Sequence, residues 1–434
     1  MHKSDERLPW LALVACLAVC VSCGENAQAP SGDPDPSWLE EHAVPINNAD
    51  PDVSEPNLAV LRATIGNARI VGMGEATHGT AEFWTMRQKL SKYLVEEMGF
   101  TAILHEAPFP NSLHIDAYVT DGVGTALEAH EKLGYWKYQE MQDLIEWIRE
   151  YNLQRDPQSP ELHYLGYDCA FRRWTESAYF ITEYLRVVDP GAVDDITTRL
   201  DSYTLEDARY VFDFFAGKSA EYIALSSTEE YELILKIAEN LEPAWQVWYN
   251  LMNGLPDGDV REGFNIGNVN WIIENLLDGG KAIIWAHNAH VGNIYLDDIA
   301  GVPAQMLGSR LKEQYGDDYY IIGTEFYGGS FMAWEYCGGT YTDFMVHQAA
   351  TPGASTYTHR FHEADIPLFY LDLNEVDYSM EEAGWLLGPM NIRFIGADYC
   401  EQNDAAYYYS TSLPVHYDGI VHFESTTPTT SITF

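Results

Sequence analysis

Histidines and carboxylic acids follow five short apolar segments of the sequence, at the point where each segment ends. The first segment, residues 68–73, is followed by Glu75 and His78. Glu106 follows segment 101–104, and Asp168 follows segment 162–167. His287 and His290 follow segment 282–285, and Glu325 follows segment 319–323. A neutral imidazole can accept a proton from water near neutral pH, and a neighbouring carboxylate can orient the ring. The pattern therefore indicates acid–base chemistry, with His78 as the candidate base.

The same five segments predict the sheet that would position these side chains. Each has the length and composition of a buried strand, and amphipathic helical stretches separate them. This alternation predicts an α/β fold with a mixed, largely parallel central sheet flanked by helices. Because ligands of such sheets bind beyond the carboxyl ends of the strands, we expect the polar clusters to line one pocket. A single acidic residue after a strand is commonly a helix cap. The prediction of a shared pocket therefore rests on the repetition of this pattern after five segments.

A long helical stretch interrupts this alternation. Between residues 175 and 278 no clear strand pattern is present, and we expect a helical subdomain packed on the sheet. The 434 residues, with a hydrophobic content of 46%, suffice for one large domain. We assign it to residues 38–434 and place the helical subdomain inside it.

An arginine lies on the buried face of the helix that follows His78. Apolar residues recur at helical spacing at positions 83, 86, 90 and 94, and Arg87 falls on the same face. A buried guanidinium needs a partner, which either Glu75 or Glu106 could supply. Such an ion pair could hold the helix to the sheet and also orient the catalytic carboxylate. Thr80 is the expected N-cap of this helix.

Sequence motifs of covalent catalysis are missing. The chain has no G-x-S-x-G or H-E-x-x-H motif, and Thr77 replaces the third glycine that a dinucleotide-binding loop after residue 71 would need. A hydrolase built from these residues would activate water with histidine or with a metal ion.

Several motifs together resemble the erythromycin esterase family. The segment Gly74–Gly79 followed by Arg87, and the segment Trp285–His290, are similar to its two histidine-containing blocks. Further similarities are the Gly166–Asp168 element and a helix that carries Arg261, Glu262 and Asn268. The matches run from about residue 71 to residue 323 in the order of the family, and little is recognised after Phe326.

This resemblance implies a mixed α/β fold and hydrolysis of an ester or lactone, macrolide-like or otherwise bulky, by water without a covalent intermediate. It implies that His78 is the general base. The supporting catalytic residues would be Glu75, Arg87, Glu106 and His287. The resemblance also implies that His290, Asp168 and Asn268 bind the substrate. We add Glu325 to this group because it follows a predicted strand. His287 or Arg87 could stabilise the oxyanion, a contribution of about 3 kcal/mol in other enzymes.

Two alternatives remain open from the sequence. In the main hypothesis the reaction needs no cofactor. In the second, His78, Glu106, His287 and Glu75 hold a divalent metal ion, since two histidines with carboxylates form a familiar ligand set. In the third the chain is a haem-binding lipoprotein, because distant relatives of the fold include such proteins and His and Tyr can ligate haem iron.

The charge of the chain restricts its partners. The formal net charge is -42, from 24 basic and 66 acidic residues. Such a surface repels phosphate backbones and anionic headgroups, so we expect a small-molecule ester or lactone as partner and no nucleic acid. The 29 tyrosines and 12 tryptophans suit a bulky, partly apolar ligand, and an acidic cleft could attract a cationic amino sugar.

The N-terminus has the pattern of a lipoprotein signal. Lys3 and Arg7 precede an apolar run at 10–21, which ends in a lipobox-like Val21–Gly24 segment. We expect a signal peptide at 1–23, acylation of Cys23, a flexible tether at 24–37 and a bacterial cell-envelope location, where the lipid is the only membrane contact. A plain secretory signal, and Cys16 as the acylated residue, are the alternatives.

Three cysteines remain beyond the signal. Cys169, Cys337 and Cys400 are widely spaced and do not form a disulfide framework. We therefore expect buried free thiols.

Overall fold

The computed structural model describes residues 36–169, 174–256, 258–296 and 304–433. The lipobox-like segment with Cys23 and most of the expected tether lie outside these residues. Within them, no helix has the length and apolar character that crossing a bilayer requires.

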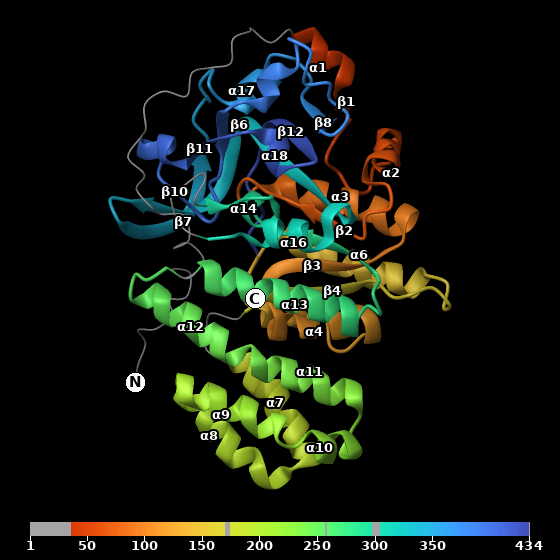
Figure 1. Cartoon of the computed structure of the whole chain (residues 1–434), viewed down its shortest axis with the longest axis vertical. Coiled ribbons are helices and arrows are strands. Elements are labelled where there is room, and N and C mark those ends of the chain that lie inside the picture. Colours follow the sequence, from red (N-terminus) through yellow and green to blue (C-terminus); the bar gives the residue numbers. More distant parts are fainter. Residues whose placement is uncertain (1–35, 170–173, 257, 297–303, 434) are drawn as a thin grey trace.

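The core is a sheet that matches the fold class expected from the sequence (Figure 1). Its strands lie in the order β1 (Val44–Pro45), β8 (Leu368–Asp372), β12 (Gly419–Thr426), β6 (Tyr319–Cys337), β2 (Ile70–Met73), β5 (Lys281–Trp285), β3 (Phe100–Pro108) and β4 (His163–Asp168). Every neighbouring pair from β12 to β4 is parallel. The strands β8 and β1 add an antiparallel edge. The five predicted strands all occur, side by side and parallel, so a mixed, largely parallel sheet is confirmed.

Helices bury both faces of the sheet, which is why its central strands are continuously apolar. On one face pack α3 (Ala81–Met98) and α6 (Gln139–Gln154), and on the other α14 (Asn288–Val291), α16 (Leu307–Tyr315) and α17 (Tyr357–His362). At the β4 edge lie α4 (Phe109–Asp121) and α5 (Ala126–Leu133). The short elements of the remaining chain are α1 (Pro36–His42), η2 (Pro56–Ala59), α2 (Val60–Ile65), η4 (Gly316–Asp318), η5 (Gly384–Leu387), η6 (Glu401–Tyr407) and α18 (Leu413–His416).

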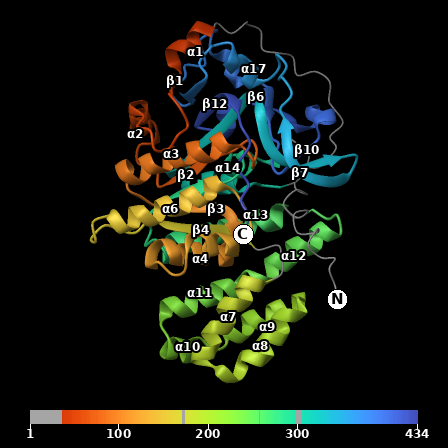
Figure 2. The ribbon, with the colours of Figure 1, turned by 180° about the vertical axis from the view of Figure 1, so that it is seen from behind.

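The segment expected to be helical contains only helices among its described residues. These are α7 (Thr175–Val188), η3 (Pro190–Ala192), α8 (Val193–Ser202), α9 (Leu205–Ala216), α10 (Ser219–Leu225), α11 (Thr228–Glu239), α12 (Leu241–Met252) and α13 (Gly258–Asn275). Helices α8 to α10 lie at the end of the molecule opposite α1 and α17 (Figures 1 and 2), whereas α13 packs against β4. The helical stretch is therefore joined to the sheet through α13.

Helix α3 carries the predicted arginine on its buried face. Its apolar positions 83, 86, 90 and 94 are all 2% exposed or less, and Arg87 is 1% exposed. The helix ends at Gly99, whose φ of 74° is the left-handed conformation that glycine adopts at helix ends. Thr80 is the N-cap residue as expected, but its hydroxyl bonds to that of Thr77 and makes no cap hydrogen bond.

The second half of β6 continues beyond the sheet as a ribbon, residues 330–348. It pairs antiparallel with β7 (Thr340–Gln348) and parallel with β10 (Asp398–Tyr399). A separate pair, β9 (Met390–Arg393) with β11 (Tyr408–Thr411), lies between β8 and β12 in the sequence. The ribbon brings the C-terminal third of the chain to the carboxyl end of β2.

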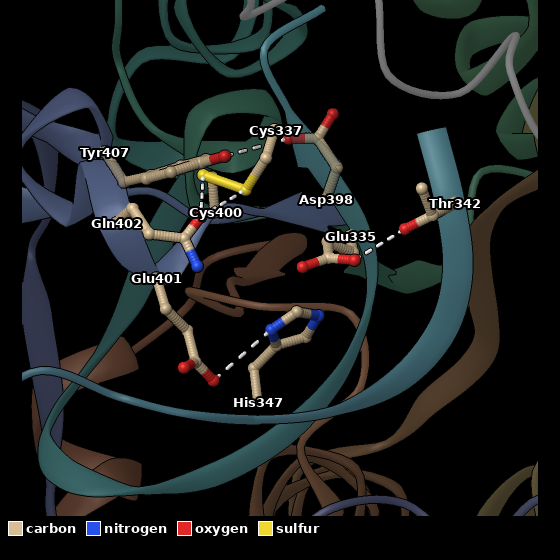
Figure 3. Close-up of a disulfide and its surroundings, with 9 residues drawn as sticks. All are labelled: Glu335, Cys337, Thr342, His347, Asp398, Cys400, Glu401, Gln402 and Tyr407. Atoms are coloured by element: carbon tan, nitrogen blue, oxygen red, sulfur yellow. Dashed lines mark hydrogen bonds and ion pairs between the residues drawn. A yellow bond between two sulfur atoms is a disulfide. The ribbon is translucent and has the colours of Figure 1, made fainter. Parts of the chain in front are cut away.

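A disulfide joins Cys337 at the end of β6 to Cys400 after β10 (Figure 3). The expectation of free thiols is wrong for these two residues, and Cys169 alone is a buried free thiol among the described residues. The reason is that β10 pairs with the end of β6, which places cysteines 63 positions apart at a Cα–Cα distance of 5.2 Å.

Candidate active site

His78 lies in the loop between β2 and α3, at the carboxyl end of the sheet. Its ring is almost buried, and Nδ1 lies 2.7 Å from Oε1 of Glu75. An ionised carboxylate can only accept a hydrogen bond, so Nδ1 carries the ring proton. Nε2 then presents its lone pair, which is the arrangement of a general base oriented by a carboxylate.

The second oxygen of Glu75 faces Arg87. Oε2 lies 2.5 Å from Nη2 of the guanidinium, and both side chains are 1% exposed. The guanidinium also lies 5.0 Å from the ring centre of Trp84 and 4.7 Å from that of Trp285. Burial lowers the pKa of Arg87, while the Glu75 carboxylate opposes the shift. Of the two partners that the sequence left open, the structure pairs Arg87 with Glu75.

Main-chain hydrogen bonds hold the His78 loop on both sides. The Gly74 N–H donates to Ile322 of β6, and the His78 N–H donates to the Gly396 carbonyl. The two glycines that flank the motif permit this close packing. A Cβ on Gly74 would lie 2.1 Å from Oδ1 of Asn288, and one on Gly79 would lie 1.9 Å from the Met332 carbonyl oxygen. Both contacts are too short for any side chain.

His287 follows β5 and faces the same loop. Its Nδ1 accepts a hydrogen bond from the Ala289 N–H, which leaves the proton of the neutral ring on Nε2. Burial lowers the pKa of His287 well below its ordinary value, and the neighbouring His78 and His290 add to the shift. Nε2 makes no hydrogen bond among the described residues, although the Ala76 carbonyl interacts with the ring. Its ring centre lies 5.5 Å from that of His78, so His287 is a neutral donor beside the base.

Glu106 connects the two histidine motifs. Its carboxylate accepts from the His287 N–H at 3.1 Å and from Nη2 of Arg261 at 2.9 Å, and it lies 3.3 Å from Nε2 of His290. Burial by itself raises the pKa of Glu106, but the charges of His290 and Arg261 hold it far below its usual range. Glu106 is therefore an ionised, fully paired carboxylate.

His290 and Asp168 belong to the charged network behind Glu106. Nδ1 of His290 lies 2.9 Å from Oε1 of Glu262, and Nε of Arg261 donates to both oxygens of Asp168. Burial lowers the pKa of His290, but Glu106 and Glu262 outweigh it, so the pKa is raised and the imidazolium is favoured. Burial raises the pKa of Asp168, and Arg261 opposes this shift.

Two expected substrate residues lie apart from this network. The Asn268 amide donates to the Tyr167 carbonyl at 2.9 Å and to Asn240 at 2.7 Å, so it ties α13 to β4 and α12. Glu325 is buried on β6, and its carboxylate oxygens make no hydrogen bond with any described side chain. Burial raises the pKa of Glu325 to about 8 although Arg393 opposes the shift.

An aromatic pocket opens over His78. Besides His78 it is lined by Tyr135, Trp136, Tyr138, Met332, Trp334, Phe344 and Ala397. All seven of these residues lie outside the motifs recognised in the sequence. They come from the loop between α5 and α6, from the ribbon and from the segment before β10, none of which carries a recognised motif.

Trp136 is held in an unusual backbone conformation at this pocket. Its φ of 52° is uncommon for a residue other than glycine. The Trp136 carbonyl lies within hydrogen-bond distance of Nε2 of His130 and of the Tyr138 N–H. The Trp136 indole N–H donates to the Glu106 carbonyl at 3.3 Å. The ring centre lies 4.9 Å from that of His78. Backbone strain maintained by several contacts is typical of functional sites.

No group of three or more His, Cys, Asp or Glu side chains in the described ranges is arranged to hold a metal ion. The carboxylates that a metal would need, Glu75 and Glu106, are each paired with a guanidinium instead. The four residues of the metal hypothesis are neighbours, but their donor atoms do not converge.

Known proteins resemble the chain over most of its length. The family model described as Erythromycin esterase matches residues 95–426, which begins after the His78 loop and extends to the end of β12. An erythromycin esterase type II of Escherichia coli is 25% identical over 67% of this chain and 77% of its own. The putative hydrolase YbfO of Bacillus subtilis is 21% identical over the full length of both.

Solved structures share the fold. A Bacillus cereus protein superposes with a TM-score of 0.75 at 24% identity, covering 92% of this chain and 98% of that one. A mutant of the erythromycin esterase EreC in its open conformation superposes with a TM-score of 0.67 at 17% identity, covering 88% and 97%.

Proposed function

Since the chain belongs to the erythromycin esterase family of hydrolases, we propose that it cleaves an ester or lactone with a water molecule activated by His78. The observation that carries this proposal is the buried series Arg87–Glu75–His78 at the pocket. It leaves Nε2 of His78 as an oriented proton acceptor facing the pocket. No nucleophilic serine or cysteine is needed for such a reaction.

Each charged group then has a defined part in the reaction. His78 takes a proton from water as the oxygen attacks the carbonyl carbon, and Glu75 stabilises the imidazolium that forms. Arg87 forms an ion pair with Glu75 and fixes the orientation of its carboxylate. The proton on His78 is later delivered to the leaving alkoxide, so the base is regenerated.

His287 is suited to stabilise the oxyanion. Its neutral ring presents Nε2–H toward the loop, where the Ala76 carbonyl is the only described group that interacts with the ring proton. One such donor contributes about 3–4 kcal/mol to the transition state in other hydrolases. Glu106, Arg261 and His290 hold the main chain of His287 and so fix this donor.

The aromatic pocket favours a bulky, partly apolar ester, of which a macrolide-like lactone is one example. We further propose a location outside the cytoplasm, anchored through acylated Cys23. The Cys337–Cys400 disulfide supports this location, because disulfides persist mainly in oxidising compartments. Palmitate labelling that survives Cys23→Ser would contradict the anchor.

The function is tested by assaying the purified chain on a panel of lactones and activated esters. His78→Ala should lower kcat by about 10⁴ or more on any substrate that is cleaved, because water is then not activated. A His78→Ala protein with wild-type circular dichroism and substantial residual turnover would refute the mechanism. His359→Ala serves as a control, since His359 lies on α17 away from the pocket.

A further inference from the structure

The pocket over His78 has the composition of a cation-binding cage. Five of its lining residues are aromatic, and no lysine or arginine of the described part of the chain lines it. Aromatic faces carry partial negative charge, and cages of tyrosine, tryptophan and phenylalanine bind alkylammonium groups.

A buried carboxyl group belongs to the same wall. Phe344 of β7 is paired with Trp334 of β6, and Trp334 is paired with Asp398 of β10. Residues in register on neighbouring strands point to the same side of a sheet. Phe344 and Trp334 both line the pocket, so Asp398 lies on the pocket side of this wall.

Two tyrosines hold the Asp398 carboxylate in place (Figure 3 shows one of them). The Tyr341 hydroxyl donates to Oδ2 at 3.0 Å and the Tyr407 hydroxyl to Oδ1 at 3.3 Å. Burial raises the pKa of Asp398 to about 6, against the opposing effects of both hydroxyls and of His78. The group is therefore mainly ionised near pH 7.5, and no basic side chain of the described residues forms an ion pair with it.

The wider site is also negative. Among the described residues, the buried charged groups linked to it comprise five carboxylates, at positions 75, 106, 168, 262 and 398, and two guanidiniums, at 87 and 261. An imidazolium at His290 leaves a negative excess. Such a field attracts a cation into a low-dielectric pocket and repels an anion.

We propose that this pocket binds a compact alkylammonium group of the substrate, packed against Trp334 and Phe344 with Asp398 as its counter-ion. The identity of the substrate as an ester rests on the function proposed above, whereas the binding of the cation does not. The ammonium sits on the Asp398 side, because a cation next to His78 would oppose formation of the imidazolium.

The test compares two ligands of one shape. Choline carries the cation, and 3,3-dimethylbutan-1-ol is its neutral isostere. Isothermal titration calorimetry of the full chain at about pH 7.5 should show choline binding at least about 10-fold more tightly. The same preference should shrink at about pH 5, where Asp398 is protonated.

Matched variants assign the effect to the wall. Asp398→Asn should abolish the preference for choline. Asp404→Asn should keep it, because Asp404 also accepts a tyrosine hydroxyl, from Tyr399, but does not line the pocket. Phe344→Leu, at a half-buried position, should weaken choline binding about 3-fold by removing one ring of the cage.

The proposal is overturned if the wild-type chain binds choline and 3,3-dimethylbutan-1-ol with equal affinity. It is also overturned if Asp404→Asn loses the preference for choline as Asp398→Asn does. Acetylcholine and 3,3-dimethylbutyl acetate extend the comparison to kcat/KM. Binding of choline without hydrolysis of any ester refutes the proposed function but not the cation site. Hydrolysis without discrimination refutes the cation site and leaves the esterase mechanism in place.

Discussion

Glu75→Gln changes one atom at the centre of the buried series and should remove the base without removing any side chain. One carboxylate oxygen faces Nδ1 of His78 at 2.7 Å and the other faces Nη2 of Arg87 at 2.5 Å. Arg87 can only donate, so the single amide oxygen of glutamine must face it. The amide NH₂ then faces His78, whose Nδ1 has to accept. The ring proton moves to Nε2, which can no longer take a proton from water.

The expected loss follows from this change of tautomer. The same carboxylate-to-amide change in serine proteases lowers kcat by about 10⁴, and we expect a similar factor here. That factor corresponds to about 5.5 kcal/mol of transition-state free energy. The variant also loses the negative partner of a buried guanidinium. Its destabilisation should stay below the about 3–5 kcal/mol expected for deleting such a partner outright, since the amide oxygen of glutamine still faces Arg87.

The assay measures kcat for the best ester of the panel, together with urea unfolding of each variant. Glu82→Gln is the matched control. It removes the same charge at the start of α3, where Glu82 accepts from the Thr427 N–H at 2.7 Å and does not contact His78. A folded Glu75→Gln protein that keeps more than about a tenth of the wild-type kcat would refute the tautomer argument.

Three further predictions follow from the structure. Prolonged EDTA or phenanthroline treatment should leave kcat unchanged, because Arg87 would repel a divalent cation at Glu75; activity lost in chelator and restored by zinc or manganese would contradict this. Replacing Cys337 and Cys400 with serine should lower the unfolding free energy by about 2–4 kcal/mol, since the disulfide links positions 63 residues apart. The replacement should also raise KM by loosening the pocket wall. A melting temperature of the wild-type chain that reductant leaves unchanged would contradict a stabilising disulfide. Burial raises the pKa of Glu325 to about 8, so its contribution to stability is complete at acidic pH and is lost as pH rises through that value. Glu325→Gln should therefore raise the melting temperature more at about pH 9 than at about pH 5, and an equal change at both would count against a neutral buried Glu325.

Local sequence determined the strands and the two histidine motifs of this protein. Strands buried on both faces are continuously apolar, and polar residues begin where burial on the sheet ends, so both are visible without knowing the neighbours. The same holds for the inward face of α3, whose helical spacing placed Arg87 in the core. The match of motifs in family order then pointed to the hydrolase family, which the family model confirms over residues 95–426.

Tertiary structure alone decided which charges are paired. From the sequence, Glu75 and Glu106 were equal candidates for Arg87, because both follow strands of the same sheet. In the fold, β5 lies between β2 and β3, which separates Glu106 from the end of β2 that carries Glu75. Glu106 instead accepts a hydrogen bond from Arg261 of α13. Similarly, Asn268 occupies a motif position but bonds to the Tyr167 carbonyl and to Asn240, away from the pocket.

The aromatic wall and the disulfide also depend on long-range pairing. Trp334 meets Phe344 across a hairpin, but it meets Asp398 only because β10 returns to β6 after more than fifty residues of intervening chain. The sequence carries no periodic signal for such a return, because strand partners are chosen by packing over the whole sheet. For this reason the candidate catalytic residues could be identified from the sequence, whereas the residues that line the pocket could be identified only from the folded structure.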